Sequence, residues 1–264
     1  MDGDLHRLVA QVEALGASLR CAVGRSALGD RGRWTTAAQL AAGDGTSLAE
    51  LMHAYGDAWG VADDRRSQAA FVILDYTWYL AAPLVAAHLL AGRLPSLDGA
   101  ALWLDTESRT GALALSDDPP RRSSPERLGE AVVAHLRPLV ERLAERRWLG
   151  ARSAWLGVGD RLVGAFEHVG DLIGQRERAQ RDASAIVHRA GSELDSPRHR
   201  FATFEHRGAA RTIGIRASCC RFYRTREARY CLTCPLVPED ERGERVREWI
   251  ASELSRSPTT TLGD

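Results

Sequence analysis

Four of the five cysteines in the chain are clustered near its C-terminal end. Cys219 and Cys220 are adjacent, and Cys231 and Cys234 follow as a Cys-x-x-Cys pair. Thiolates bind soft and borderline metal ions, form disulfides and take part in electron transfer. Because the rest of the chain nearly avoids cysteine, we expect these four thiols to form one chemical site.

Three kinds of site could use these thiols. Structural zinc takes four ligands in a tetrahedron, commonly from two Cys-x-x-Cys pairs, and here only Cys231 and Cys234 have that spacing. Neighbouring side chains in extended backbone point to opposite faces, so Cys219 and Cys220 make a poor second pair. A [2Fe–2S] cluster accepts four cysteine ligands over a wider footprint. The chemistry favours the cluster, but structural zinc and a disulfide or transient redox role stay open.

The elements on either side of the cysteines predict the fold. Helical patterns cover residues 4–20, 47–59, 65–92, 124–148, 151–174, 175–190 and 238–254. Paired apolar runs around glycine-containing turns predict hairpins at 101–116 and 200–218. Helices this numerous pack as a bundle. We therefore predict a mainly α fold with small β-hairpins (α+β), divided into a helical body (1–199) and a small C-terminal module (200–264).

The composition limits the classes of function. The chain of 264 residues has 44% hydrophobic residues, a formal net charge of zero and 35 basic residues, all of them arginine. The absence of lysine is typical of high-GC codon usage, so arginine content by itself does not indicate phosphate recognition. A neutral chain is a poor candidate for a dedicated nucleic-acid binder. We predict no nucleic-acid partner.

The sequence also predicts where the protein works. The N-terminus is acidic and then amphipathic, which is not the pattern of a secretory signal. Residues 69–92 are apolar enough to span a membrane, but they contain Asp75, Pro83 and His88, which would be costly in lipid. We therefore expect a buried helix, no integral membrane segment and a cytoplasmic protein, in which thiols stay reduced.

The cysteine spacing Cys-Cys-x10-Cys-x2-Cys, here "CCRFYRTREARYCLTCP", resembles that of the FhuF family of ferric siderophore reductases. The resemblance implies a [2Fe–2S] cluster held by Cys219, Cys220, Cys231 and Cys234. Over the rest of the chain the resemblance is limited to the order of its parts and to its length. It implies a siderophore-binding role for the helical body. No residue of that body matches a substrate-contacting motif.

The resemblance implies a one-electron reduction of Fe(III)-siderophore that releases Fe(II). Hard oxygen donors hold Fe(III) tightly and Fe(II) weakly, so one electron loosens the chelate. The sequence "GDGTSL" (43–48) is too weak a match to indicate a dinucleotide site, so we expect an external donor such as a ferredoxin or flavin reductase. The alternatives are an iron–sulfur redox or iron sensor that acts through a partner, and a zinc-stapled binding module.

A basic stretch surrounds the cysteines and predicts a docking surface. Between residues 207 and 229 the chain has seven arginines and a single acid, Glu227. These arginines either offset the charge of an anionic cluster or steer an anionic substrate or donor. The candidate docking residues are Arg216, Arg221, Tyr223, Arg224 and Arg226.

Other chemically capable residues have simpler interpretations. Cys21 lies far from the four clustered cysteines in sequence and has apolar neighbours, so we expect a core residue. Glu167, His168 and Asp171 have metal-binding side chains, but their spacing fits a solvated helix face.

Overall fold

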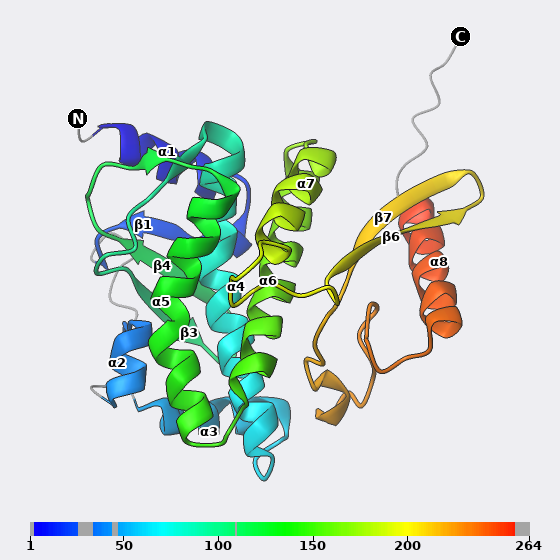
Figure 1. The fold of residues 1–264 in the computed structure, drawn as a ribbon, viewed down its shortest axis with the longest axis horizontal. Coiled ribbons are helices and arrows are strands. Elements are labelled where there is room, and N and C mark those ends of the chain that lie inside the picture. The colour runs from blue at the N-terminus through cyan, green and yellow to red at the C-terminus, as the bar shows by residue number, and fades with distance from the viewer. Residues whose placement is uncertain (1–2, 26–33, 44–46, 109, 257–264) are drawn as a thin grey trace.

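The computed structural model describes residues 3–25, 34–43, 47–108 and 110–256 (Figure 1). It confirms the mainly α fold with small β elements. The α-helices are α1 (Gly3–Glu13), α2 (Ala37–Ala42), α3 (Leu48–Trp59), α4 (Arg65–Ala91), α5 (Pro125–Glu145), α6 (Ala151–Leu172), α7 (Arg176–Val187) and α8 (Glu239–Arg256). In the described part of the chain, the 3-10 turns are η1 (Ala17–Leu19) and η3 (Phe222–Arg224).

Helix α4 runs through the centre of the helical body, and this position explains its composition. It is apolar on nearly all faces because it packs against α3, α5 and α6. It begins at the N-cap Asp64, whose side chain accepts the Ser67 N–H, and ends at Gly92 in the left-handed conformation. By length and composition α4 could cross a membrane, but 83% of its most apolar window is buried in the structure. This burial supports the predicted core helix.

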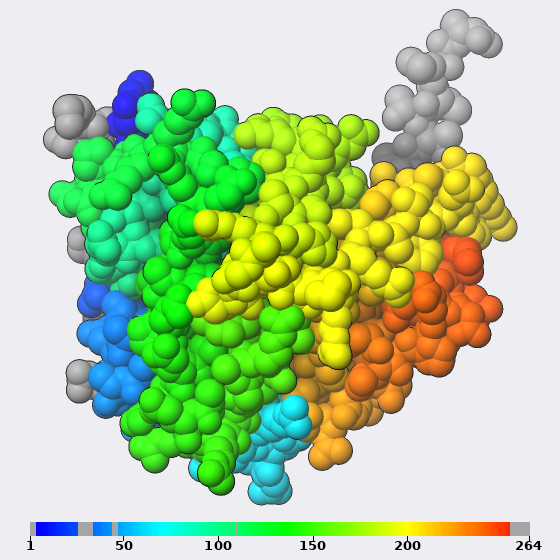
Figure 2. Space-filling view, in the orientation of Figure 1, coloured from blue at the N-terminus to red at the C-terminus, as the bar shows by residue number. Residues whose placement is uncertain are grey.

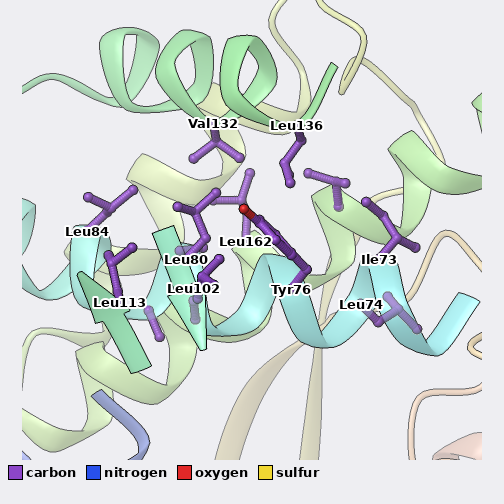
Figure 3. Packing of buried hydrophobic residues seen from close by; sticks show 14 of the residues in the cluster. Ile73, Leu74, Tyr76, Leu80, Leu84, Leu102, Leu113, Val132, Leu136 and Leu162 are labelled. Atoms are coloured by element: carbon purple, nitrogen blue, oxygen red, sulfur yellow. The ribbon is translucent and has the colours of Figure 1, made fainter. Parts of the chain in front are cut away.

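The main core lies where α4 meets α5, α6 and the three-stranded sheet (Figure 3). Tyr76, Leu80 and Leu84 of α4 face Val132 and Leu136 of α5. Each large apolar side chain that is fully buried stabilises the fold by roughly 1.5–3 kcal/mol. The body therefore has a continuous core that can hold its surface residues in fixed positions.

Three small sheets complete the fold. Strands β1 (Cys21–Val23), β4 (Thr110–Leu115) and β3 (Ala101–Asp105) form one sheet in that order, β2 (Arg93–Leu94) pairs with β5 (Arg121–Arg122), and β6 (Arg200–His206) pairs with β7 (Ala209–Ile215). The antiparallel pairs β3–β4 and β6–β7 confirm the two predicted hairpins. The parallel pairing of β1 with β4 was not predicted.

Most helix predictions agree with the structure, and the first one is too long. The helix predicted over residues 4–20 ends at Glu13, because Gly16 has a φ of 145° and the chain continues as a 3-10 turn. The capping box predicted at Ser47 and Glu50 is present, with both hydrogen bonds formed.

A second, smaller core lies in the C-terminal module. Ile213 and Ile215 of β7 pack with Val246 and Ile250 of α8. Buried residues of the main core extend to Leu194, and the partly buried Phe201 and Cys220 also pack against it. The division of the chain at residues 199–200 stays a prediction.

Candidate metal centre

The cysteine segment, residues 216–237, connects β7 to α8. In Figure 1 it forms the orange loops between α4 and α6 on one side and α8 on the other. Figure 2 shows that these residues form part of the outer surface beside the helical body. Cys234 is only 2% exposed, whereas Cys219, Cys220 and Cys231 are partly exposed. The site is therefore built at a surface rather than deep in the core.

The structure brings the thiols of the two pairs together. The Sγ atoms of Cys220 and Cys231 lie 3.8 Å apart. Cys219 and Cys231 each interact electrostatically with Cys220 and Cys234. All four thiols are free. The two ends of the predicted motif thus converge on one site.

The backbone around Cys219 and Cys220 has an unusual shape that makes this possible. Arg221 has a φ of 61°, in the left-handed region that costs a non-glycine residue on the order of 1–3 kcal/mol. The turn lets the Arg221 N–H donate to Cys219 Sγ at 3.3 Å, and the Phe222 N–H also bonds to Cys220. Backbone N–H groups directed at sulfur stabilise thiolates and tune iron–sulfur sites.

The electrostatics of the cysteine pair differ from those of isolated thiols. The hydrogen bond to Cys231, helped by the charges of Arg216 and Arg161, lowers the pKa of Cys220 to about 5. The same bond and burial raise the pKa of Cys231. Of the two thiols, Cys220 therefore ionises more readily, and the thiolate is the form that binds metal.

The residues present fit a two-iron cluster. Within the described ranges, no group of three or more His, Cys, Asp or Glu side chains is arranged to hold a metal ion. A [2Fe–2S] cluster spreads four thiolate ligands over two irons, so it tolerates more widely spaced sulfurs than one tetrahedral zinc ion. Four free thiols from one surface segment match this requirement in number and chemistry.

A buried carboxylate that the sequence did not reveal fixes the start of the cysteine segment. Asp160 of α6 accepts hydrogen bonds from the Ala217 N–H at 2.7 Å and from the Ser218 N–H at 3.0 Å. Its side chain is 1% exposed and also lies 3.5 Å from Arg216 Nη2 and 3.3 Å from His199 Nε2. Burial alone would raise the pKa of Asp160, but Arg216 and these hydrogen bonds lower it. The ionised carboxylate holds the backbone immediately before Cys219.

A second carboxylate anchors the segment on its other side. Asp64, the N-cap of α4, accepts from Arg221 Nη2 at 2.8 Å and from Arg224 Nε at 3.3 Å. Burial opposes its ionisation, but the hydrogen bonds from Arg221 and Ser67 hold the pKa of Asp64 well below its usual range. These ion pairs join the cysteine segment to the start of α4.

The predicted docking residues therefore have structural contacts as well. Arg216, Arg221 and Arg224 pair with acids of the helical body, and Arg226 Nη2 donates to the Asp57 carbonyl. Tyr223 stacks on Tyr230 with ring centroids 5.4 Å apart. That any of the five contacts a substrate or donor stays a prediction.

Two cavities reach the cysteines from different sides. One, of about 310 Å³, is lined by Cys219, Arg66, Arg198 and Arg221 among others. The other, of about 360 Å³, is lined by Cys220 and Cys231 together with Arg161, Arg216 and aromatic side chains. Both are therefore enclosed in part by arginine.

The remaining sequence candidates have structural roles. Cys21 is buried in β1, as predicted for a core residue. The prediction of a solvated face for Glu167, His168 and Asp171 is wrong in part, because Glu167 is only partly exposed and accepts the Gly214 N–H at 2.7 Å. His168 contacts Ser18, and Asp171 pairs with Arg176. Each of the three side chains therefore contacts a different partner.

Comparison with known proteins supports the cysteine site. No curated protein matches the chain. Residues 216–236 match the family model of the FhuF 2Fe-2S C-terminal domain, and the match includes all four clustered cysteines. The match confirms the resemblance inferred from their spacing and indicates a [2Fe–2S] cluster as the cofactor. Over these residues the chain is thus similar to the iron–sulfur domain of the FhuF family.

Proposed function

We propose that the protein is a ferric siderophore reductase, and that Cys219, Cys220, Cys231 and Cys234 hold its [2Fe–2S] cluster. The observation that carries the proposal is a segment with four free thiols, three of them partly exposed, that matches the FhuF iron–sulfur domain. A centre that exchanges electrons with a partner must lie near the surface. A metal ion that only stabilises the fold does not need to lie near the surface.

The reaction is a one-electron reduction of the chelated iron. When bound, an all-cysteine [2Fe–2S] cluster supplies single electrons, at potentials that reach about −400 mV in plant-type examples. Fe(III) in the siderophore takes up one electron and becomes Fe(II), which hard oxygen donors hold weakly. The electron comes from a reduced ferredoxin or flavin protein, and no bond of the siderophore itself is broken.

The residues of this chain would bind and orient the reactants. The cavity beside Cys219 has guanidinium groups from Arg66, Arg198 and Arg221, which attract anionic chelates. Tyr230 lines the other cavity beside Cys231 and is partly exposed, with its ring stacked on Tyr223 and beneath the Arg245 guanidinium. The five free cysteines of the chain suit the reducing conditions of the cytoplasm, where we place the protein.

Single-turnover oxidation tests the proposal. The protein is reduced with dithionite under anaerobic conditions, desalted, and titrated with a ferric hydroxamate or a ferric catecholate chelate while a strong Fe(II) chelator is present. We expect at least one of the chelates to reoxidise the cluster and to yield one Fe(II) per cluster. Visible absorption follows the cluster, and the coloured Fe(II) complex follows the product.

Two controls make the result specific. The gallium(III) form of the same chelate cannot accept an electron, so it should leave the cluster reduced. Cys220→Ser should bind no intact cluster and release no Fe(II). If neither ferric chelate reoxidises the cluster while a small inorganic oxidant does, the centre is redox-active but the reductase function is wrong.

A further inference from the structure

The cavity beside Cys220 and Cys231 contains two arginines that the proposed reaction does not explain. Arg216 follows β7, and Arg161 lies on α6, so they come from the two sides of the cavity. The side chain of Arg216 is 16% exposed, and that of Arg161 is also mostly buried. Guanidinium groups are rarely buried unless they have partners.

These two arginines do not have an acceptor for every N–H group. Arg216 Nη2 lies 3.5 Å from Asp160 Oδ2, and Arg161 Nη2 donates to Asp75 Oδ1 at 3.2 Å. In the described part of the chain, the buried Arg216 Nη2 and Arg161 Nε have no hydrogen-bond partner. An unsatisfied buried N–H of a charged group is costly, so a native structure normally supplies an acceptor.

The acceptor that the cavity offers is sulfur. Arg216 interacts electrostatically with Cys220, Cys231 and Cys219, and Arg161 interacts with Cys220. Both cations also repel each other, because they lie close together in a poorly solvated space. A negatively charged group between them and the cysteines would relieve the repulsion and satisfy the free N–H groups.

We propose that Arg216 and Arg161 set the reduction potential of the cluster. A cluster with four thiolate ligands is anionic, and reduction adds one more negative charge. Buried positive charges beside it stabilise the reduced state more than the oxidised state, which raises the potential. The inference rests on the cluster and not on the siderophore, since the potential is measured without any substrate.

Charge-removing variants test the proposal. The midpoint potential of the cluster-loaded protein is measured by spectroelectrochemistry for the wild type, Arg216→Gln, Arg161→Gln and Arg216→Lys. We expect each glutamine variant to lower the equilibrium constant for reduction at least about tenfold, which is about 59 mV for a one-electron couple. Arg216→Lys should retain most of the wild-type potential, because the charge is kept.

Arg229 provides the matched control. It lines the same cavity, but its side chain is 72% exposed and pairs with Glu227, so solvent screens its charge. Arg229→Gln should therefore shift the potential much less. Asp160→Asn should move the potential in the opposite direction, because it removes a negative charge beside Arg216. A general loss of local structure would not lower the potential in the arginine variants and raise it in Asp160→Asn.

Electron paramagnetic resonance of the reduced variants confirms that each still holds a [2Fe–2S] cluster. If Arg216→Gln does not fold, the comparison of Arg161→Gln with Arg229→Gln decides the question. The proposal is overturned if the buried-arginine variants shift the potential no more than Arg229→Gln does.

Discussion

At the scale of single residues, the five cysteines show how the surroundings decide what a thiol does. Cys21 is buried in β1, where burial and the nearby Glu13 raise its pKa to about 12. Cys220 lies beside Cys231, Arg216 and Arg161, and its pKa falls to about 5. The first thiol packs in the core and resists ionisation, whereas the second favours the thiolate, the form that metals bind.

This contrast predicts different effects of the same kind of substitution. Cys220→Ser should lose the visible absorption and the bound iron, because a hydroxyl is a much poorer ligand for iron than a thiolate. Cys21→Ala should keep both, with only a modest loss of stability from the small cavity it leaves. Iron content and visible spectra of anaerobically purified variants check the prediction. Loss of the cluster in Cys21→Ala would show that the site has been assigned to the wrong thiols.

At the scale of elements, β7 is the link between the helical body and the cysteine segment. The strand passes α6 so closely that a Cβ atom on Gly214 would lie 2.5 Å from Val163 Cγ1. At the same place Glu167 accepts the Gly214 N–H, and Asp160 accepts the N–H groups of Ala217 and Ser218. One face of α6 therefore sets the position at which the cysteines begin.

The close approach predicts that Gly214→Ala destabilises the protein by about 1–3 kcal/mol, because the added methyl group forces β7 away from α6. Gly164→Ala on the same helix is the matched control, since its nearest neighbour, Trp78, lies at an ordinary 3.9 Å. That change should be neutral or stabilising by up to about 1 kcal/mol, as alanine favours helix. Chemical denaturation followed by circular dichroism measures both. Equal effects of the two substitutions would contradict the close packing.

At the scale of the whole molecule, the two parts have very different means of stabilisation. The main core extends from α1 to residue 194, whereas the second core has four buried residues, Ile213, Ile215, Val246 and Ile250. The free energy gained by burying so few side chains is small. It offsets only part of the entropy lost when the hairpin, the cysteine segment and α8 become ordered. We expect the ion pairs of Asp64 and Asp160, together with the cluster when it is bound, to supply the rest of the stabilisation.

Removal of the cluster should therefore loosen only the C-terminal part. After treatment with a chelator and a reductant, we expect hydrogen exchange to increase strongly over residues 200–256. The amides of α4 and α6 should stay protected, because the main core does not depend on the metal. Mass spectrometry of exchanged peptides from the holo and apo proteins makes the comparison. Uniform loss of protection across both parts would show that the cluster stabilises the whole chain.

The sequence alone determined the features that depend on local order. Helical periodicity located α3 to α8 because each amphipathic or apolar pattern reflects neighbours on one helix. Turn residues between apolar runs located both hairpins. The spacing of Cys219, Cys220, Cys231 and Cys234 indicated the cluster, since a metal motif within one short segment needs no long-range information.

The tertiary structure decided everything that joins distant parts of the chain. Asp64 meets Arg221 across 157 residues, and Asp160 bonds to Ser218 across 58. A single acid on a helix has the same local pattern whether it faces water or a buried arginine, so neither partner could be identified in the sequence. The strand β1 is three residues long and exists because β4 offers it a parallel edge. Long-range hydrogen bonds and charge pairs of this kind depend on how the helices pack, which no local pattern encodes.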